Sequence, residues 1–292
     1  MQIIVTGAQG QVGWELTQRA PRLGHAVLAW DQTELDITDA AAVDRALSAS
    51  GADVVINAAA YTAVDKAEQE AERAFAVNRD GPAHLAAACA RMNIPLLHLS
   101  TDYVYDGVKS GAYVEDDPTA PIGVYGASKL AGDQAVRQLL SRHLILRVSW
   151  VFGVHGHNFV KTILRLARER EELRVVADQQ GCPTFAGDIA DTLLELAGRI
   201  VEIDTNDTWG TYHYCGEPAT TWHGFASAIV EQARARESLP LKTITAITTA
   251  DYPTPAARPA NSVLDCSQLM TQLGIRPRPW RNGLEVMLFS SD

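Results

Sequence analysis

The chain has 292 residues, of which 47% are hydrophobic and 21% charged, and its formal net charge is −10. This composition is ordinary for a globular protein of one large or two modest domains. The acidic balance argues against a nucleic-acid binder or a protein held on anionic membranes, because both need a basic surface. No apolar run reaches the roughly 18 residues of a membrane span, so we expect no membrane partner.

The cysteines and the first residues bear on the compartment. The four cysteines are far apart and form no C-x-x-C pair: Cys89, Cys182, Cys215 and Cys266. We therefore expect neither a zinc site nor a disulfide framework. The chain starts with a strand-like apolar run and not with a basic and apolar leader, so we expect no signal peptide and a cytoplasmic location.

The first half alternates short apolar runs with longer amphipathic segments. Strands are predicted near residues 3–5, 26–30, 53–59, 95–101 and 143–148. Helices are predicted after residue 13 and near 39–50, 66–92 and 125–140. Continuous apolar runs separated by helices are typical of strands buried on both faces, and hence of a parallel sheet with helices on each side.

The second half has a different pattern. Helices are predicted near residues 157–171, 187–200, 222–236 and 280–289, with short strands near 173–177, 211–215 and 243–247. The proline-rich stretch 252–260 cannot be helical. We expect a smaller lobe that covers the carboxyl ends of the strands, where such sheets bind ligands.

Three glycines follow the first predicted strand at a spacing of three: Gly7, Gly10 and Gly13. Glycine lets a ligand approach the backbone closely, and the free N–H groups at a helix start attract an anion. A glycine triplet alone also fits a tight strand-to-helix turn. The strand before it and the helix after it favour a seat for the diphosphate of a dinucleotide.

Asp31 ends the second predicted strand, 18 residues after Gly13. A carboxylate at this place binds the 2′-hydroxyl of the adenosine ribose and repels a 2′-phosphate, which favours NAD over NADP. A turn aspartate is the alternative. Beyond the third predicted strand, the small residues of 57–62 let a cofactor lie against the backbone, although tight helix–sheet packing also explains them.

Tyr125 and Lys129 form a Y-x-x-x-K pattern on a predicted helix, where residues four apart share one face. A neighbouring ammonium is expected to lower the pKa of the phenol and make it a usable acid or base. Alone, the pattern is common on solvated helix faces. Here Thr101 precedes it at the end of a strand, so its hydroxyl is predicted to point into the same cleft.

With these features the chain resembles the extended short-chain dehydrogenase/reductase superfamily. The segments TGAQGQVG, LSTDYVYDG, VYGASKLAGD, LRVSWVFG, DQQGCPT and YPTPAARPANSVLD are similar to the dTDP-4-dehydrorhamnose reductase family, over about residues 2–289. The resemblance implies an α/β fold with a Rossmann-type doubly wound parallel sheet and a smaller α/β substrate-binding lobe. The dinucleotide-binding domain is expected over residues 1–150 and the substrate lobe mainly over 151–292, partly interleaved with the first.

The resemblance also implies an activity. An enzyme of this family reduces the C4 ketone of dTDP-4-dehydro-β-L-rhamnose to dTDP-β-L-rhamnose with NADPH or NADH, the last step of dTDP-L-rhamnose synthesis for cell-surface polysaccharides. Tyr125 would protonate the nascent alkoxide, Lys129 would hold the nicotinamide ribose, and Thr101 would hydrogen-bond to the carbonyl oxygen. The chain would be a monomer or a homodimer.

Further binding residues follow from the resemblance. The cofactor residues would be Gly7, Gly10, Gln11, Val12, Gly13, Asp31, Asp36, Ile37, Ala60, Tyr61, Thr62, Tyr125 and Lys129. Thr101, Asp102 and Trp150 would contact the sugar. Three further candidate substrate residues are chosen because they lie in segments expected to close the smaller lobe over the site: Asn158, Arg258 and Asn261. A salt bridge that holds the proline-rich loop is an equal alternative for Arg258.

Other patterns carry weaker hypotheses. The family resemblance allows Mg²⁺, and Glu15 is a candidate contributor, but no cluster of oxygen ligands in the sequence demands a metal, so we predict no metal site. His155 and His157 fit loop residues better than metal ligands. Trp222 and His223 fit packing and helix capping. Two other functions stay open: a silent regulatory subunit similar to the methionine adenosyltransferase beta subunit, and a nucleotide-sugar epimerase or dehydratase.

Overall fold

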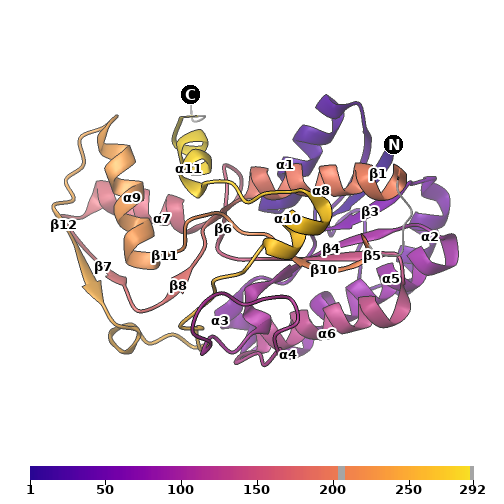
Figure 1. Ribbon diagram of the computed structural model, residues 1–292, viewed down its shortest axis with the longest axis horizontal. Coiled ribbons are helices and arrows are strands. Elements are labelled where there is room, and N and C mark those ends of the chain that lie inside the picture. Colours follow the sequence, from indigo (N-terminus) through magenta and orange to yellow (C-terminus); the bar gives the residue numbers. More distant parts are fainter. Residues whose placement is uncertain (203–207, 290–292) are drawn as a thin grey trace.

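The structure is a computed structural model that describes residues 1–202 and 208–289. Its largest element is a sheet of six strands in the order β10-β5-β4-β3-β1-β2 (Figure 1). The strands are β1 (Gln2–Thr6), β2 (Ala26–Trp30), β3 (Val54–Asn57), β4 (Leu96–Thr101), β5 (His143–Val148) and β10 (Gly210–His213). Every pairing between neighbours is parallel, which confirms the predicted sheet. The strand order reverses between β1 and β3, where doubly wound sheets bind ligands at their carboxyl ends.

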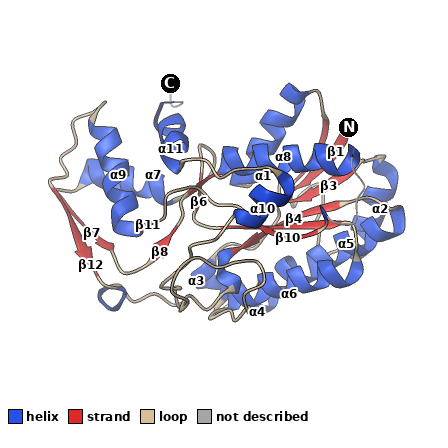
Figure 2. Cartoon of the chain, in the orientation of Figure 1, coloured by secondary structure: helices blue, strands red, loops and turns tan. Residues whose placement is uncertain are grey.

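Two helical layers cover this sheet (Figure 2). Ile3 and Val5 of β1 pack into one core with α1 (Gln11–Arg19) and α8 (Ala186–Glu202), whereas Ile4 packs into a second core with α2 (Ala40–Ser50), α5 (Gly81–Met92) and α6 (Val124–Leu139). Successive side chains of a strand point to opposite faces, so an uninterrupted apolar run serves both cores. The continuous runs of the sequence therefore belong to strands buried on both sides, as predicted.

The helix predicted over residues 66–92 is not continuous. It is divided into α3 (Val64–Ala67), α4 (Ala71–Phe75), a π-helical turn (Ala76–Asp80) and α5. Pro82 at the start of α5 has no N–H for the carbonyl of Asn78, four residues before it. That carbonyl lies against α6, since a Cβ built on Gly132 would be 2.0 Å from it. The helical conformation is interrupted at residues 68–70 and then continues from Ala71 to Met92 through the π-helical turn, from which the Asn78 side chain reaches the loop after β3.

The smaller lobe has a core of its own. Helices α7 (Phe159–Glu169), α9 (Trp222–Arg234) and α11 (Trp280–Phe289) pack around Phe152, Phe225 and Trp280. Strands β7 (Glu172–Val176) and β12 (Thr243–Ile247) pair in parallel beside them. Figure 1 shows this lobe at the opposite end of the molecule from α2 and α5.

The two halves of the sequence interleave. Helix α8 and strand β10 come from the second half of the chain but contribute Ile189, Leu193 and Tyr212 to the first core. The strand predicted near 211–215 therefore lies at the edge of the main sheet. Four two-residue strands and one short helix were not predicted: β6 (Val151–Phe152), β8 (Gln180–Gly181), β9 (Thr184–Phe185), β11 (Thr220–Thr221) and α10 (Ser267–Leu273). Within the described residues, none of the helices combines the length and apolarity needed to cross a membrane.

Candidate functional site

The glycine turn joins β1 to α1 at the topological switch point. Gly7 has a φ of +72°, and a Cβ added to it would lie 2.5 Å from the backbone nitrogen of Ala59. A Cβ on Gly13 would lie 2.1 Å from the carbonyl oxygen of Gly7. Gly10 is the N-cap of α1 and offers no capping side chain, so the first N–H groups of the helix stay available to an anion. The turn fits the diphosphate of a dinucleotide.

Asp31 stands directly after β2, beside this turn. Its Oδ1 accepts hydrogen bonds from the backbone nitrogen and the hydroxyl of Thr33, at 2.6 and 2.7 Å. Hydrogen bonding with Glu34 and with Thr33 lowers the pKa of Asp31 to about 2. The carboxylate is therefore ionised at neutral pH and held in one orientation.

Asp36 and Ile37, the two candidates for the adenine side of the cofactor, differ in their exposure to solvent. Asp36 is exposed and accepts hydrogen bonds from the backbone nitrogen and hydroxyl of Thr38, at 2.9 and 2.8 Å. Ile37 is 5% exposed and packs in the core, where its Cδ1 would be 2.5 Å from a Cβ on Gly81. The Ile37 side chain thus supports α5, and Asp36 is the member of the pair that faces solvent.

The stretch of Ala60, Tyr61 and Thr62 is held next to α6. The backbone of Tyr61 exchanges two hydrogen bonds with the Asn78 side chain, at 2.8 and 3.0 Å. Asn78 also donates to the hydroxyl of Ser128 at 2.9 Å, and Ser128 lies between Tyr125 and Lys129 on α6. Asn78 therefore ties the loop after β3 to the helix that carries the Y-x-x-x-K pattern.

Thr101 and Tyr125 meet where β4 ends. Thr101 donates from its hydroxyl to Oδ1 of Asp102 at 3.0 Å, and Tyr125 on α6 lies close enough for Thr101 to influence the pKa of its phenol. The ring of Tyr103 stands edge-on to that of Tyr125, with centroids 5.5 Å apart. The structure brings the predicted strand-end hydroxyl and the phenol together.

Lys129 is buried, and its Nζ donates to the carbonyl oxygen of Leu99 at 2.7 Å. Burial lowers the pKa of Lys129 to about 8, opposed by the nearby carboxylate of Asp133. Burial also raises the pKa of Tyr125, opposed by the Thr101 hydrogen bond. The prediction that Lys129 lowers the pKa of Tyr125 is therefore wrong here, because desolvation outweighs any effect of the ammonium. The phenol is held protonated.

Asp102 is 2% exposed and lies beside this pair. Burial raises its pKa to about 6, while hydrogen bonds from Ser262 and Thr101 favour its charged form. A carboxyl group with such a pKa can exchange a proton close to neutral pH.

Trp150 follows β5 and has a φ of +45°, unusual for a residue with a side chain. Its indole stacks on that of Trp222 at the start of α9. Gly181 approaches closely, since a Cβ there would lie 2.3 Å from the Trp150 ring. Trp222 packs as predicted, and it packs on a candidate substrate residue.

The remaining candidates have structural partners. Arg258 forms an ion pair with Asp65 at 2.9 Å and donates to the Ala256 carbonyl at 3.1 Å, so the salt-bridge alternative describes its contacts. Asn261 donates to the carbonyls of Lys109 and Gly111 and accepts from the backbone nitrogen of Val263.

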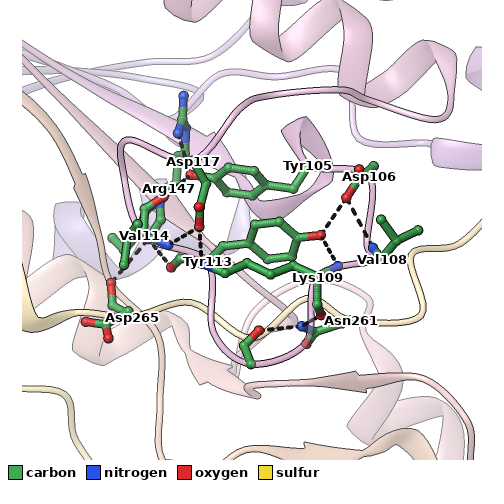
Figure 3. A network of polar contacts seen from close by, with 12 residues as sticks. Tyr105, Asp106, Val108, Lys109, Tyr113, Val114, Asp117, Arg147, Asn261 and Asp265 are labelled. Atoms are coloured by element: carbon green, nitrogen blue, oxygen red, sulfur yellow. Dashed lines mark hydrogen bonds and ion pairs between the residues drawn. The ribbon is translucent and has the colours of Figure 1, made fainter.

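Figure 3 shows how the loop around residues 105–117 is fixed beside Asn261. Tyr113 donates from its hydroxyl to Asp106 at 2.6 Å, and Lys109 pairs with Asp117. Arg147 of β5 donates to the hydroxyl of Tyr105 at 2.7 Å. Asn261 therefore holds the loop around residues 105–117 in place and has its amide occupied in doing so.

Within residues 1–202 and 208–289, no three His, Cys, Asp or Glu side chains are placed so that they could hold a metal ion together. Glu15 instead forms an ion pair with Arg19 at 2.8 Å, and Arg19 also binds Asp191 at 2.9 Å.

Comparison with known proteins adds to this geometry. Residues 1–291 match the family model described as the RmlD substrate binding domain. The chain belongs to this family.

The chain matches several relatives over nearly the full length of both chains. The chain is 47% identical to the dTDP-4-dehydrorhamnose reductase of Aggregatibacter actinomycetemcomitans, over 97% of both chains. It is 47% identical to that of Burkholderia thailandensis over 96% of both. The crystal structure of the Bacillus anthracis dTDP-4-dehydrorhamnose reductase in complex with NADP superposes with a TM-score of 0.91, at 35% identity and 99% coverage of each chain. The predicted family and fold are confirmed.

Some contacts of the site were not predicted. Asn78 holds the loop after β3, and His155 and Asn158 contact the glycine turn from the smaller lobe. The only local signal for the contacts from the smaller lobe was the polar run His155-Gly156-His157-Asn158. By sequence this run is typical of an ordinary loop, and its contacts with the glycine turn depend on how the two lobes pack.

Proposed function

We propose that the chain reduces the C4 ketone of dTDP-4-dehydro-β-L-rhamnose to dTDP-β-L-rhamnose at the expense of NADH or NADPH. The grouping of Thr101, Tyr125 and Lys129 at the carboxyl end of β4 carries the proposal. The names of the most similar relatives supply the substrate. Within this proposal, residues 1–150 bind the dinucleotide, and residues 151–292 mainly bind the sugar nucleotide. Helix α8 and strand β10 are the exceptions, because they pack in the core of the first domain.

The chain's own residues account for the proton and the orientation of the ketone. Bound NAD(P)H supplies the hydride to C4. Tyr125 donates a hydrogen bond to the ketone oxygen, where negative charge develops, and the Thr101 hydroxyl turns from Asp102 to donate to the same oxygen when the substrate binds. Burial keeps Tyr125 protonated at neutral pH, so the phenol can deliver its proton to that oxygen.

Lys129 is proposed to act on the cofactor side. Its Nζ is anchored on the Leu99 carbonyl at the end of β4, and an ammonium has three N–H donors. The remaining donors can bind the hydroxyl groups of the nicotinamide ribose.

Substrate contacts are proposed for Asp102 and Trp150. Asp102 follows Thr101 directly and can accept hydrogen bonds from the sugar. Trp222 covers one face of the Trp150 indole, and the part of the indole that stays exposed can contact the sugar ring. Asn158, Arg258 and Asn261 are proposed to hold the segments around the substrate in place through the contacts described above.

The choice of nucleotide is proposed to rest on Asp31. Its carboxylate is ionised and fixed by Thr33, so it accepts hydrogen bonds from a ribose diol and repels a 2′-phosphate. We therefore propose that NADH is used at least as well as NADPH.

The proposal is tested by mixing purified protein with dTDP-4-dehydro-β-L-rhamnose and either NADH or NADPH while following the absorbance of the reduced nicotinamide. Stoichiometric oxidation with formation of dTDP-β-L-rhamnose supports it. No oxidation with either nucleotide refutes it. Interconversion of sugar nucleotides without net oxidation would identify an epimerase or dehydratase instead.

A further inference from the structure

The loop that leads into α7 belongs to the smaller lobe, but its side chains lie on the glycine turn. The Nε2 of His155 donates to the carbonyl oxygen of Gln9 at 3.0 Å, because a carbonyl can only accept. The His155 ring also stacks on Trp14 in the first turn of α1, with centroids 5.3 Å apart and planes 5° apart.

Asn158 makes a second contact with the same turn. Its amide nitrogen donates to Oε1 of Gln11 at 2.9 Å and to the carbonyl of Gly153 at 2.8 Å. Its Oδ1 accepts from the backbone nitrogen of Lys161 at 3.1 Å and so caps α7. The residue is 8% exposed, and its amide is fully engaged.

These contacts orient two polar groups of the turn that could face a bound diphosphate: the peptide between Gln9 and Gly10 and the side-chain amide of Gln11. The carbonyl of Gln9 accepts from His155, and the N–H of Gly10 donates to the carbonyl of Gly7 at 2.9 Å, so the peptide between Gln9 and Gly10 is fixed at both ends. A carbonyl held toward His155 cannot turn its negative end toward a diphosphate. With its oxygen bound to Asn158, the Gln11 amide has only N–H groups to offer.

We propose that His155 and Asn158 are positioning residues for the dinucleotide, which preset the glycine turn from the opposite lobe before the diphosphate binds. A turn that is already ordered loses less conformational entropy on binding, and this raises affinity. The proposal rests on the proposed function in one respect, that a nicotinamide dinucleotide is the ligand of the turn.

Two substitutions isolate the contacts. His155→Phe keeps a ring to stack on Trp14 but removes the donor to Gln9. Asn158→Ser keeps a side chain that caps helices well, but it is too short to reach Gln11. Each change is expected to raise the Kd for NADH and NADPH about two- to tenfold, the effect of one lost hydrogen bond. The dissociation constants are measured by calorimetric titration without the sugar substrate, and the loss is expected in Kd and in KM for the nucleotide more than in kcat.

His157→Ala is the matched control, because His157 is exposed in the same loop and contacts Thr162, at 3.4 Å, instead of the turn. Its Kd is expected to equal that of the unaltered protein. Unaltered Kd values in both His155→Phe and Asn158→Ser overturn the proposal, and so does an equal loss in His157→Ala.

A double-substitution cycle covers the case in which Asn158→Ser perturbs folding. In a Gln11→Ala background, Asn158→Ser is expected to change Kd no further, and a full further loss contradicts the proposal. If the unaltered protein binds neither nucleotide, the proposed function and this inference both fail. If it binds and oxidises them while the variants bind equally well, only the inference fails.

Discussion

Trp150 lies face to face with Trp222, with ring centroids 3.6 Å apart and planes 7° apart. The first indole follows the last central strand of the first half, and the second starts helix α9 of the smaller lobe. The stack therefore joins the strand edge to the lobe that is proposed to bind the sugar. It also fixes Trp150 in a backbone conformation, with φ of +45°, that few residues with side chains adopt.

Trp222→Ala is expected to raise KM for the sugar nucleotide about two- to tenfold, because an aromatic pair contributes roughly 0.5–1.5 kcal/mol and Trp150 would lose its support. Initial rates at varied sugar nucleotide and saturating NADH measure the effect. Trp222→Phe keeps a stacking ring and is expected to restore most of it. An unchanged KM in Trp222→Ala would show that the stack of Trp150 and Trp222 does not contribute to binding of the sugar nucleotide.

Tyr125→Phe is expected to lower kcat by roughly 10²–10⁴-fold, because the proposed proton donor is removed. Its Kd for the nucleotides is expected to stay close to that of the unaltered protein. Tyr103→Phe is the matched control, since its ring packs against Tyr125 but carries no proposed proton. Turnover of Tyr125→Phe within threefold of the unaltered protein would remove this phenol from its role.

Asp31→Ala is expected to shift the ratio of kcat/KM toward NADPH, because an ionised carboxylate no longer meets the 2′-phosphate. Asp36→Ala is the comparison, since Asp36 accepts the same pair of hydrogen bonds from Thr38 that Asp31 accepts from Thr33. Its effect is expected to be alike for both nucleotides. Equal changes of the kcat/KM ratio in the two variants would refute the proposal that Asp31 specifically recognises the adenosine ribose.

Asp102→Asn is expected to raise Tm at pH 7 and above while lowering activity. Burial raises the pKa of Asp102 to about 6, above its value in the unfolded chain, so folding favours its protonated form. The protonated carboxyl group of Asp102 favours the folded state fully below about pH 4, and this contribution to stability is lost as the pH rises through 6. The ionised group then opposes folding by up to about 3 kcal/mol, which the neutral amide avoids.

Melting curves from pH 4 to 8 check this sign. The advantage of Asp102→Asn is expected to shrink as the pH falls below about 5. Asp106→Asn should behave in the opposite way, because hydrogen bonding to Tyr113 lowers the pKa of Asp106 and its stabilising effect disappears as pH falls. A pH-independent difference for Asp102→Asn would contradict the raised pKa.

Gly13→Ala is expected to abolish nucleotide binding, because its Cβ would lie 2.1 Å from the carbonyl oxygen of Gly7. Gly198→Ala is the matched control in α8, where a Cβ meets no atom within 4 Å. There the substitution is expected to stabilise the chain by roughly 0.5–1 kcal/mol. Calorimetric titration and melting curves test the pair, and retained NADH affinity in Gly13→Ala would place the dinucleotide elsewhere.

Much of the fold was accessible from local pattern. The apolar runs ending at Thr6, Asn57 and Thr101 became central parallel strands, because only strands buried on both faces need uninterrupted apolar residues. The helix over residues 66–92 was predicted as continuous because alanine-rich sequence favours helix, and both the interruption at residues 68–70 and the π-helical turn before Pro82 were missed.

The sequence by itself determined the residues that share one local element: the three glycines of the turn, Tyr125 with Lys129 on α6, and Thr101 at a strand end. Their spacing is set by helix and strand geometry, which a short stretch of chain encodes. Tertiary structure alone decided what each group meets. It buried Lys129 and desolvated the phenol of the half-buried Tyr125, which raised the pKa of Tyr125 where the sequence predicted a lowered one. It also placed Asn158 on Gln11, 147 residues earlier in the chain, because contacts between lobes depend on packing that no local pattern encodes.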